Sequence, residues 1–178
     1  MDSVVVKDKL FRKFISREQI DQAVQEIADR INIDYTGKNP LLLGVLNGAF
    51  IFASDLIRKL DIQCQISFVK YASYSGIQST EKIRTLIGIN EEVKERHVIV
   101  VEDIVDSGIT MDYLLKDIQK YKPASVRLAC FCLKPDAFVK HFKIDYLGME
   151  IENAFVVGYG LDYDGYGRNL TEIYKIVI

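Results

Sequence analysis

The chain has 178 residues, 49% of them hydrophobic and 27% charged, and its formal net charge is −2. This length suits one domain with its own core, and the composition is that of an ordinary globular protein. The balanced charge argues against a nucleic-acid or membrane-surface partner, and neither a signal-peptide pattern nor an apolar run of membrane length is present. We therefore expect a cytoplasmic protein that binds neither nucleic acid nor membrane.

Three cysteines, Cys64, Cys130 and Cys132, each stand among apolar residues in a strand-like segment. A zinc site would need a second group of cysteine or histidine ligands, and no such group accompanies them. We expect reduced thiols in the core, as in a cytoplasmic protein.

Helical spacing and short apolar runs alternate along the first half of the chain. A capping-box pattern begins at Ser16 and precedes apolar residues at helical spacing, which predicts an amphipathic helix. Residues 41–46 predict a strand that is buried on both faces, 49–60 a helix, and 62–68 a second strand. Residues 70–82 are small and polar without an apolar period, which is typical of a functional lid.

The second half continues this alternation. A strand is expected at 83–89, the most apolar strand at 98–101, and a helix at 111–121. Strands that alternate with helices predict an α/β fold, in which a mostly parallel central sheet is flanked by helices on both faces. The remaining expected strands cover residues 126–133, 146–151, 154–158 and 173–177.

A tight polar loop follows the most apolar strand and opens the next helix. Backbone N–H groups at a helix start, together with the positive end of the helix dipole, bind phosphate, and Gly108 permits close approach of the backbone. The loop therefore predicts an anion site beyond the carboxyl end of the sheet, where open α/β sheets bind ligands. Its residues are Asp106, Ser107, Gly108, Ile109 and Thr110.

Two acids, Glu102 and Asp103, stand just before this loop. Carboxylates beside an anion site would repel the phosphate unless they bind something else. Ribose hydroxyls donate to carboxylates, and Mg²⁺ prefers oxygen ligands, so both fit this position. A phosphate on one side and a diol with a metal ion on the other describe a ribose 5-phosphate.

Other phosphate motifs fit this segment less well. A Walker A loop needs an upstream glycine and a lysine, but Ile109 stands where the lysine would be, and a G-x-G-x-x-G motif is absent. The D-x-D pattern of a phosphatase needs closer spacing than that of Asp103 and Asp106. If Asp106 or Ser107 merely capped the helix, the two acids at the end of an apolar strand would stay unexplained.

The segment V-V-E-D-I-V-D-S-G-I-T resembles the phosphoribosyl-pyrophosphate signature of type I phosphoribosyltransferases. Over nearly its whole length the chain is similar to the hypoxanthine-guanine branch of that family. The resemblance implies the type I phosphoribosyltransferase fold in a single domain over residues 1–178. It also implies a small hood subdomain, formed by the N-terminal segment and the region around 135–178.

Further segments in family order carry the branch assignment. Leu46, Asn47 and Gly48 resemble a pyrophosphate loop, in which the resemblance implies a cis peptide bond between Leu46 and Asn47. Many relatives have lysine in place of Asn47. Ser73 and Tyr74 resemble the mobile lid of the family, which would shield a reacting ribosyl cation from water.

The last matching segments lie after residue 133, and the resemblance assigns them to substrate binding. Lys134 would donate to the purine 6-oxo group, Phe155 would stack on the base, and the Val156 backbone would contact the edge of the base. Asp162 would lie at the purine end of the site and help to hold a second Mg²⁺, and Arg168 would contact pyrophosphate. Taken alone, a lysine is usually solvated and a phenylalanine is usually part of the core.

The resemblance implies an enzyme of purine salvage. It would transfer the 5-phosphoribosyl group of 5-phosphoribosyl-1-pyrophosphate to N9 of hypoxanthine or guanine, giving IMP or GMP and pyrophosphate, with Mg²⁺ as cofactor. Glu102 and Asp103 would bind the ribose and a metal ion, residues 106–110 would hold the ribose 5-phosphate, and Asp106 is our candidate general base. The family also implies a homodimer or homotetramer.

Two alternatives stay open at this point. A regulatory protein of the same fold could bind the sugar donor without catalysis, but it could dispense with Asp106, the lid and Lys134, and it would usually carry a nucleic-acid-binding module. The other alternative is an enzyme of the same fold that prefers xanthine or another base. The sequence does not rank hypoxanthine, guanine and xanthine.

Overall fold

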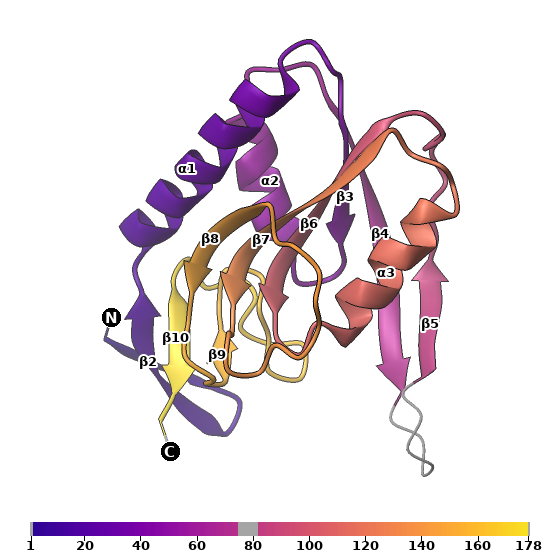
Figure 1. Cartoon of the computed structure of the whole chain (residues 1–178). Helices are drawn as coiled ribbons and strands as arrows, with labels where there is room; N and C mark the ends of the chain where they lie inside the picture. Colours follow the sequence, from indigo (N-terminus) through magenta and orange to yellow (C-terminus); the bar gives the residue numbers. More distant parts are fainter. Residues whose placement is uncertain (1, 75–81, 178) are drawn as a thin grey trace.

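The computed structural model describes residues 2–74 and 82–177, and in these residues the chain forms two sheets and three helices (Figure 1). The larger, central sheet consists of β3 (Leu41–Val45), β4 (Gln65–Tyr74), β5 (Lys82–Ile87), β6 (His97–Val105), β7 (Ser125–Leu133) and β8 (Tyr146–Glu150). Its strand order is β5-β4-β3-β6-β7-β8. All neighbouring pairs are parallel except β4 with β5, which confirms the predicted mostly parallel sheet.

The helices cover both faces of this sheet, as predicted. They are α1 (Arg17–Tyr35), α2 (Phe50–Arg58) and α3 (Ile109–Gln119). Buried side chains of α1 and α2 share one apolar cluster with the sheet, and those of α3 share another, so α3 lies on the opposite face (Figure 1). Because both faces are covered, every residue of β3 is buried, which explains its unbroken apolar sequence.

The start of α1 follows from its sequence. The Ser16 side chain accepts from the Gln19 N–H at 3.3 Å, and the Gln19 side chain accepts from the Ser16 N–H at 2.9 Å. This reciprocal pair confirms the predicted capping box and satisfies two donors that the helix itself leaves free.

The second sheet is smaller and joins the two ends of the chain. It consists of β1 (Ser3–Val6), β2 (Lys9–Ile15), β10 (Ile173–Ile176) and β9 (Val156–Val157), in that order. Its first two strands were not among the sequence-based predictions, although Phe11 and Ile15 are buried and the residues between them are more exposed. The small core of this sheet contains Val6, Phe11, Val157 and Tyr174.

One predicted boundary was wrong in a way that matters for the lid. The strand expected at 62–68 lies at 65–74, because β5 offers it an antiparallel partner from Lys70 to Tyr74. The backbone hydrogen bonds of this hairpin stabilise a polar sequence that shows no apolar period of its own. Ser73 and Tyr74 therefore end β4, while residues 75–81 lie outside the described residues and the lid stays a prediction.

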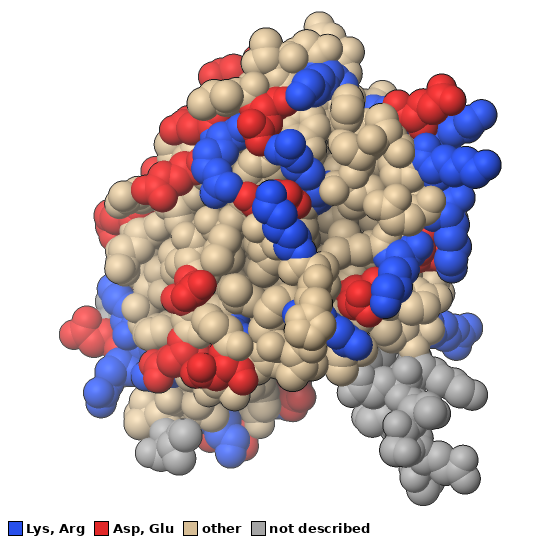
Figure 2. Space-filling model, in the orientation of Figure 1, with Lys and Arg blue, Asp and Glu red and all other residues tan. Residues whose placement is uncertain are grey.

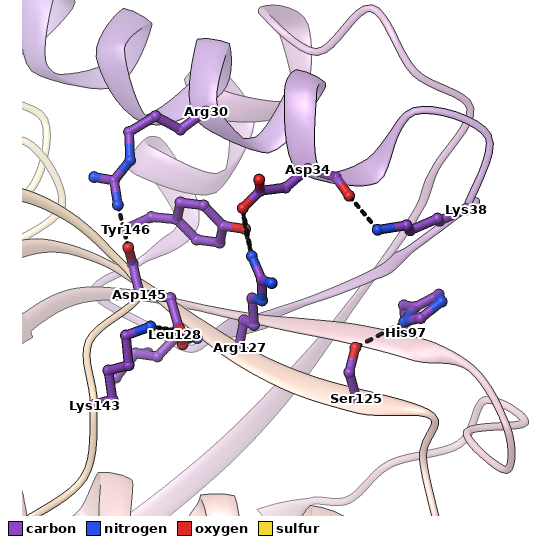
Figure 3. A network of polar contacts seen from close by, with 10 residues as sticks. All are labelled: Arg30, Asp34, Lys38, His97, Ser125, Arg127, Leu128, Lys143, Asp145 and Tyr146. Atoms are coloured by element: carbon purple, nitrogen blue, oxygen red, sulfur yellow. Dashed lines mark hydrogen bonds and ion pairs between the residues drawn. The ribbon is translucent and has the colours of Figure 1, made fainter.

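The amino ends of the parallel strands are tied to α1 by a polar network (Figure 3). Arg127 donates to the carboxylate of Asp34 and, at 2.6 Å, to the hydroxyl oxygen of Tyr146, whose O–H donates to Asp34 at 2.7 Å. The Asp145 carboxylate accepts from the Leu128 N–H at 3.0 Å. The network therefore holds the last turn of α1 against β7 and β8, at the edge opposite to the strand ends that carry the predicted site.

The outer surface carries charges of both signs. On the face shown in Figure 2, acidic and basic side chains lie side by side along α1 and above the sheet. Among the described residues, no helix has both the length and the apolar character needed to cross a membrane.

Candidate active site

The predicted site residues gather at one edge of the central sheet. β3 and β6 are neighbours and run parallel, and the chain leaves β3 towards β4 but leaves β6 towards β7. Such a reversal is a topological switch point, outside which open α/β sheets bind ligands. The segments that follow β3, β6 and β7 meet at this edge, and they carry Asn47, Asp106 and Lys134.

The loop after β6 has the form of an anion cradle. Gly108 has a left-handed backbone (φ +80°) and is the N-cap of α3, so the N-cap residue has no side chain that could cap this helix end. Ser107 Oγ accepts from the Ile109 N–H at 3.4 Å, and Asp106 is turned away towards Lys134. Asp106 is therefore not a helix cap. A cavity of about 130 Å³ lies here, lined by Glu102 and by residues 104–111.

Two aromatic side chains pack against the loop after β6 at Gly108. A Cβ added to Gly108 would lie 2.7 Å from the ring of Phe138, which stacks edge-to-face on Phe142. Glycine is therefore required here by both the positive φ and the close packing. This packing fixes the backbone of the loop.

The two acids before the loop have different surroundings. Glu102 lines the cavity beside the cradle, and its Oε2 atom is buried without a hydrogen-bond partner among the described residues. Asp103 is 7% exposed, its Oδ1 accepts from the Ile104 N–H at 3.0 Å, and its carboxylate lies so close to Gly48 that a Cβ there would overlap it. The two acids therefore face different regions: Glu102 faces the cavity beside the loop after β6, and Asp103 faces the loop after β3.

The pKa values of both carboxyl groups are raised, which means that their charged forms lack sufficient stabilisation in the folded chain. Burial, and then the negative charge of Asp103, raises the pKa of Glu102 well above its ordinary value. Burial raises the pKa of Asp103 to about 6, with Arg168 lowering it and Asp162 raising it. Buried carboxylates without a cation beside them are unfavourable, so hydroxyl donors or a metal ion would stabilise them.

Asp106 and Lys134 form an ion pair of 2.9 Å between Asp106 Oδ2 and Lys134 Nζ. The lysine side chain is 10% exposed and the aspartate side chain 54% exposed. A lysine that is usually solvated is here buried at the end of β7, where its Nζ points at the candidate base. The sequence assigned separate roles to the two residues but did not predict their contact.

The loop after β3 contains the cis peptide bond expected between Leu46 and Asn47. Asn47 Oδ1 accepts from Lys70 Nζ at 3.2 Å. Sequence reasoning missed Lys70 because it stands at the start of the polar stretch that was taken as a lid. Since β4 lies beside β3 in register, the neighbouring strand brings a cation to this loop.

The loop between β9 and β10 packs onto the loop after β3. A Cβ on Gly160 (φ +98°) would lie 2.1 Å from the carbonyl oxygen of Gly48. Arg168 donates to the Gly160 carbonyl at 2.6 Å and pairs with Asp162 Oδ1 at 2.6 Å. Residues 164 and 165 form a tight hairpin turn, with positive φ at both residues and a bridge between residues 163 and 166.

Val156 begins β9 of the small sheet, and Phe155 directly precedes it. Phe155 is 46% exposed as a residue, and its ring packs edge-to-face on Tyr163, with 5.8 Å between ring centroids. The Val156 side chain is buried, and its backbone pairs with Lys175 in β10. The exposed surface of the phenylalanine ring is available to another flat ring.

The carboxylate oxygens predicted to bind Mg²⁺ have suitable chemistry for this ion, although they do not form one cluster. Among residues 2–74 and 82–177, no three or more His, Cys, Asp or Glu side chains are gathered closely enough to hold a metal ion. Glu102, Asp103 and Asp162 are therefore not a ready-made centre of three carboxylates. The unpartnered oxygen of Glu102 and the buried Asp103 are nevertheless hard oxygen ligands of the kind that Mg²⁺ accepts together with phosphate oxygens.

Known proteins share both the sequence and this architecture. The hypoxanthine-guanine-xanthine phosphoribosyltransferase of Tritrichomonas foetus is 37% identical over 97% of this chain and 95% of its own. The Mycobacterium tuberculosis (strain H37Rv) hypoxanthine-guanine phosphoribosyltransferase is 38% identical over 89% of this chain and 82% of its own.

A solved structure and a family model show the same relationship to phosphoribosyltransferases. The crystal structure of a hypoxanthine-guanine phosphoribosyltransferase from Bacillus anthracis, with HEPES in its active site, matches with a TM-score of 0.89 at 35% identity, covering 93% of this chain and 98% of that one. The model of the phosphoribosyl transferase domain family matches residues 16–164. The chain therefore belongs to the phosphoribosyltransferase family, with the type I fold of its hypoxanthine-guanine members.

Proposed function

We propose that this chain is a hypoxanthine-guanine phosphoribosyltransferase of purine salvage. It transfers the 5-phosphoribosyl group of 5-phosphoribosyl-1-pyrophosphate to N9 of hypoxanthine or guanine and releases pyrophosphate. The observation that carries the proposal is the contact between Asp106 and Lys134 beside the cradle of residues 107–110. It joins a candidate base, a candidate purine ligand and a phosphate site at one sheet edge.

The cradle positions the sugar donor. N–H groups at the start of α3 and the hydroxyls of Ser107 and Thr110 hold the 5′-phosphate, which fixes the reacting carbon without taking part in bond making. Glu102 and Asp103 accept hydrogen bonds from the ribose hydroxyls, and their negative charge stabilises the positive charge that develops on the ribose ring. Mg²⁺, when bound, neutralises the leaving pyrophosphate.

The purine is held by residues from both sheets. Lys134 Nζ donates to the 6-oxo group, the exposed surface of Phe155 stacks on the base, and the Val156 backbone contacts its edge. Asp106 accepts the proton that the purine ring loses. It is the more exposed partner of the ion pair, so it can reach the base while Lys134 stays buried.

The pyrophosphate subsite lies where the loops at 46–48 and 158–168 meet. Backbone groups of this first loop, together with Lys70 and Arg168, surround the position of the leaving group. Ser73 and Tyr74 begin the lid in this proposal. The small sheet that joins the two chain ends is the hood of the single domain.

The wider setting is part of the same proposal. The three cysteines are free thiols, and two of them are buried, as a reducing cytoplasm allows. A homo-oligomer is supported by Leu86 and Ile87, which are apolar and exposed on the edge strand β5. A similar Trypanosoma cruzi hypoxanthine phosphoribosyltransferase has been studied for the role of its C-terminal region in its oligomeric state.

The test is a turnover assay with the sugar donor, Mg²⁺ and one base at a time. IMP and GMP should form from hypoxanthine and guanine, and a chelator should stop both reactions. Xanthine is included because a relative named for it is 37% identical to this chain, and adenine serves as the negative control. If no oxopurine is converted but the donor binds, a regulatory function replaces the enzymatic one.

A further inference from the structure

We propose that Tyr71 is a positioning residue, whose hydrogen bond to Asp117 fixes the distance between the loop after β3 and the cradle after β6, so that one sugar donor can occupy both. The inference rests on the proposed function and deepens it. In that proposal the loop after β3 holds the pyrophosphate end of the donor, and the cradle at the start of α3 holds its 5′-phosphate end.

The hydrogen bond joins β4 to α3. The Tyr71 O–H donates to Asp117 Oδ2 at 3.1 Å, while Asp117 Oδ1 accepts from Lys120 Nζ at 2.9 Å. Tyr71 is 8% exposed, and its ring packs edge-to-face on Tyr113, one turn before Asp117 in α3 (Figure 1). Burial, and then the hydrogen bond to Asp117, raises the pKa of Tyr71, so the hydroxyl stays protonated and remains a donor at neutral pH.

The same part of β4 also holds the loop after β3. The Leu46 N–H donates to the Val69 carbonyl at 2.8 Å, and Lys70 Nζ donates to Asn47 Oδ1 at 3.2 Å. Consecutive side chains of a strand point to opposite faces, so Lys70 reaches this loop while Tyr71 packs in the apolar cluster beneath α3. This part of β4 therefore contacts the loop of one subsite and the helix of the other.

The hydrogen bond adds a defined distance to the packing of α3. Met111, Leu114 and Ile118 hold the helix to the sheet by apolar contacts, which are not directional. A hydrogen bond, in contrast, is effective only over a narrow range of length and angle. The bond from Tyr71 therefore sets where α3 lies beside β4, and a shift of the helix would also move the N–H groups at its start.

Only a ligand that occupies both subsites depends on this distance. The donor carries a phosphate at one end of its ribose and pyrophosphate at the other, so both ends bind fully only when the two subsites are correctly spaced. Ribose 5-phosphate and pyrophosphate each occupy one subsite and do not depend on the spacing. A positioning role therefore predicts a selective loss of donor binding, whereas general damage to the fold would weaken the binding of all three ligands.

The experiment is calorimetric titration of the donor, ribose 5-phosphate and pyrophosphate, each with Mg²⁺, into the wild-type chain, Tyr71→Phe, Asp117→Ala and Tyr113→Phe. Each of the first two variants should bind the donor about 10-fold more weakly, as expected for losing a hydrogen bond to a charged group, with changes below about 2-fold for the smaller ligands. Tyr113→Phe is the matched control, because it removes a hydroxyl from the same aromatic contact but keeps the bond between Tyr71 and Asp117. It should bind all three ligands like the wild type.

The double variant Tyr71→Phe/Asp117→Ala should bind the donor no more weakly than either single variant, because both changes remove the same bond. Additive losses, unchanged donor binding by Tyr71→Phe, or equal losses for all three ligands would overturn the inference. If Tyr71→Phe is unstable, Asp117→Ala removes the bond from the side of α3 and decides the matter. If the wild type binds neither ribose 5-phosphate nor pyrophosphate, the proposed function fails, which is a different result from equal binding by wild type and variants.

Discussion

The Asp106 carboxylate is half exposed and accepts a hydrogen bond from a lysine that is almost fully buried. Asparagine at this position keeps the size of the side chain and can still accept from Lys134, but it cannot take a proton from a purine. We expect Asp106→Asn to lower kcat by about 10²–10⁴-fold, the usual contribution of a general base, with a much smaller change in donor affinity. Steady-state kinetics together with direct titration of the donor would show this, and undiminished turnover would remove Asp106 from the role.

Asp103, a residue of the proposed site, lowers the stability of the fold at neutral pH. Burial raises its pKa to about 6, so the folded chain binds this proton more tightly than the unfolded chain does. The contribution of Asp103 to stability therefore falls as pH rises between about 4 and 6 and stays low above that range.

We expect Asp103→Asn to raise the free energy of unfolding at pH 7.5, because the folded chain then no longer contains this buried carboxylate. The gain should vanish at pH 4, where the wild-type carboxyl is protonated. Thermal unfolding at the two pH values checks this. A variant less stable than the wild type at pH 7.5 would contradict it, and turnover of the stabilised variant should fall because the ribose and metal lose a ligand.

Between elements, the network of Figure 3 carries a different pH dependence. The hydrogen bond from Tyr146, and then that from Arg127, lowers the pKa of Asp34 against the opposing effect of burial. The folded chain therefore binds this proton less tightly than the unfolded chain. The resulting stability is present above about pH 4 and is lost as pH falls through the lowered pKa.

We expect Asp34→Asn to lower the melting temperature at pH 7, because Arg127 loses its charged partner and α1 is held less firmly against β7 and β8. The difference from the wild type should shrink as pH approaches 3. Asp136→Asn, at an exposed position in the loop after β7, serves as the control and should change little at either pH. A constant difference across this range would show that the charge of Asp34 does not contribute.

Element prediction from sequence succeeded where local signals agree with the fold. The capping box at Ser16 and the unbroken apolar run of β3 place their elements correctly, since each depends on residues close together in the chain. β1, β2 and the far half of β4 depend on partners elsewhere. β1 has three consecutive valines, but a strand of four residues, like the polar far half of β4, is stable only when it pairs with a neighbouring strand.

At the scale of the whole molecule, the loop between β9 and β10 contacts the loop after β3 where Gly160 lies against Gly48. Alanine at 160 would combine a positive φ with an overlap of the Gly48 carbonyl at 2.1 Å, whereas Gly165 has a similar φ (+86°) and no atom within 4 Å of an added Cβ. We expect Gly165→Ala to cost about 1–2 kcal/mol of stability, the price of an unfavourable φ alone. Gly160→Ala should cost clearly more and should also weaken pyrophosphate binding, because the loop after β3 must shift.

Chemical denaturation and pyrophosphate titration of both variants check this prediction. Equal losses in the two variants would show that the contact between the loops carries no energy. A loss of stability in Gly160→Ala without any loss of affinity would separate the contact from the subsite.

The sequence by itself determined the class of fold, the cradle after β6 and the acids before it, because these features depend on consecutive residues. Its resemblance to known enzymes added the residues after 133. Only the tertiary structure paired Asp106 with Lys134, brought Lys70 to Asn47 and closed Arg168 onto Asp162 beside Gly48. These contacts join different strands or the two ends of a loop, and their geometry depends on strand register and backbone turns that no local pattern of residues encodes.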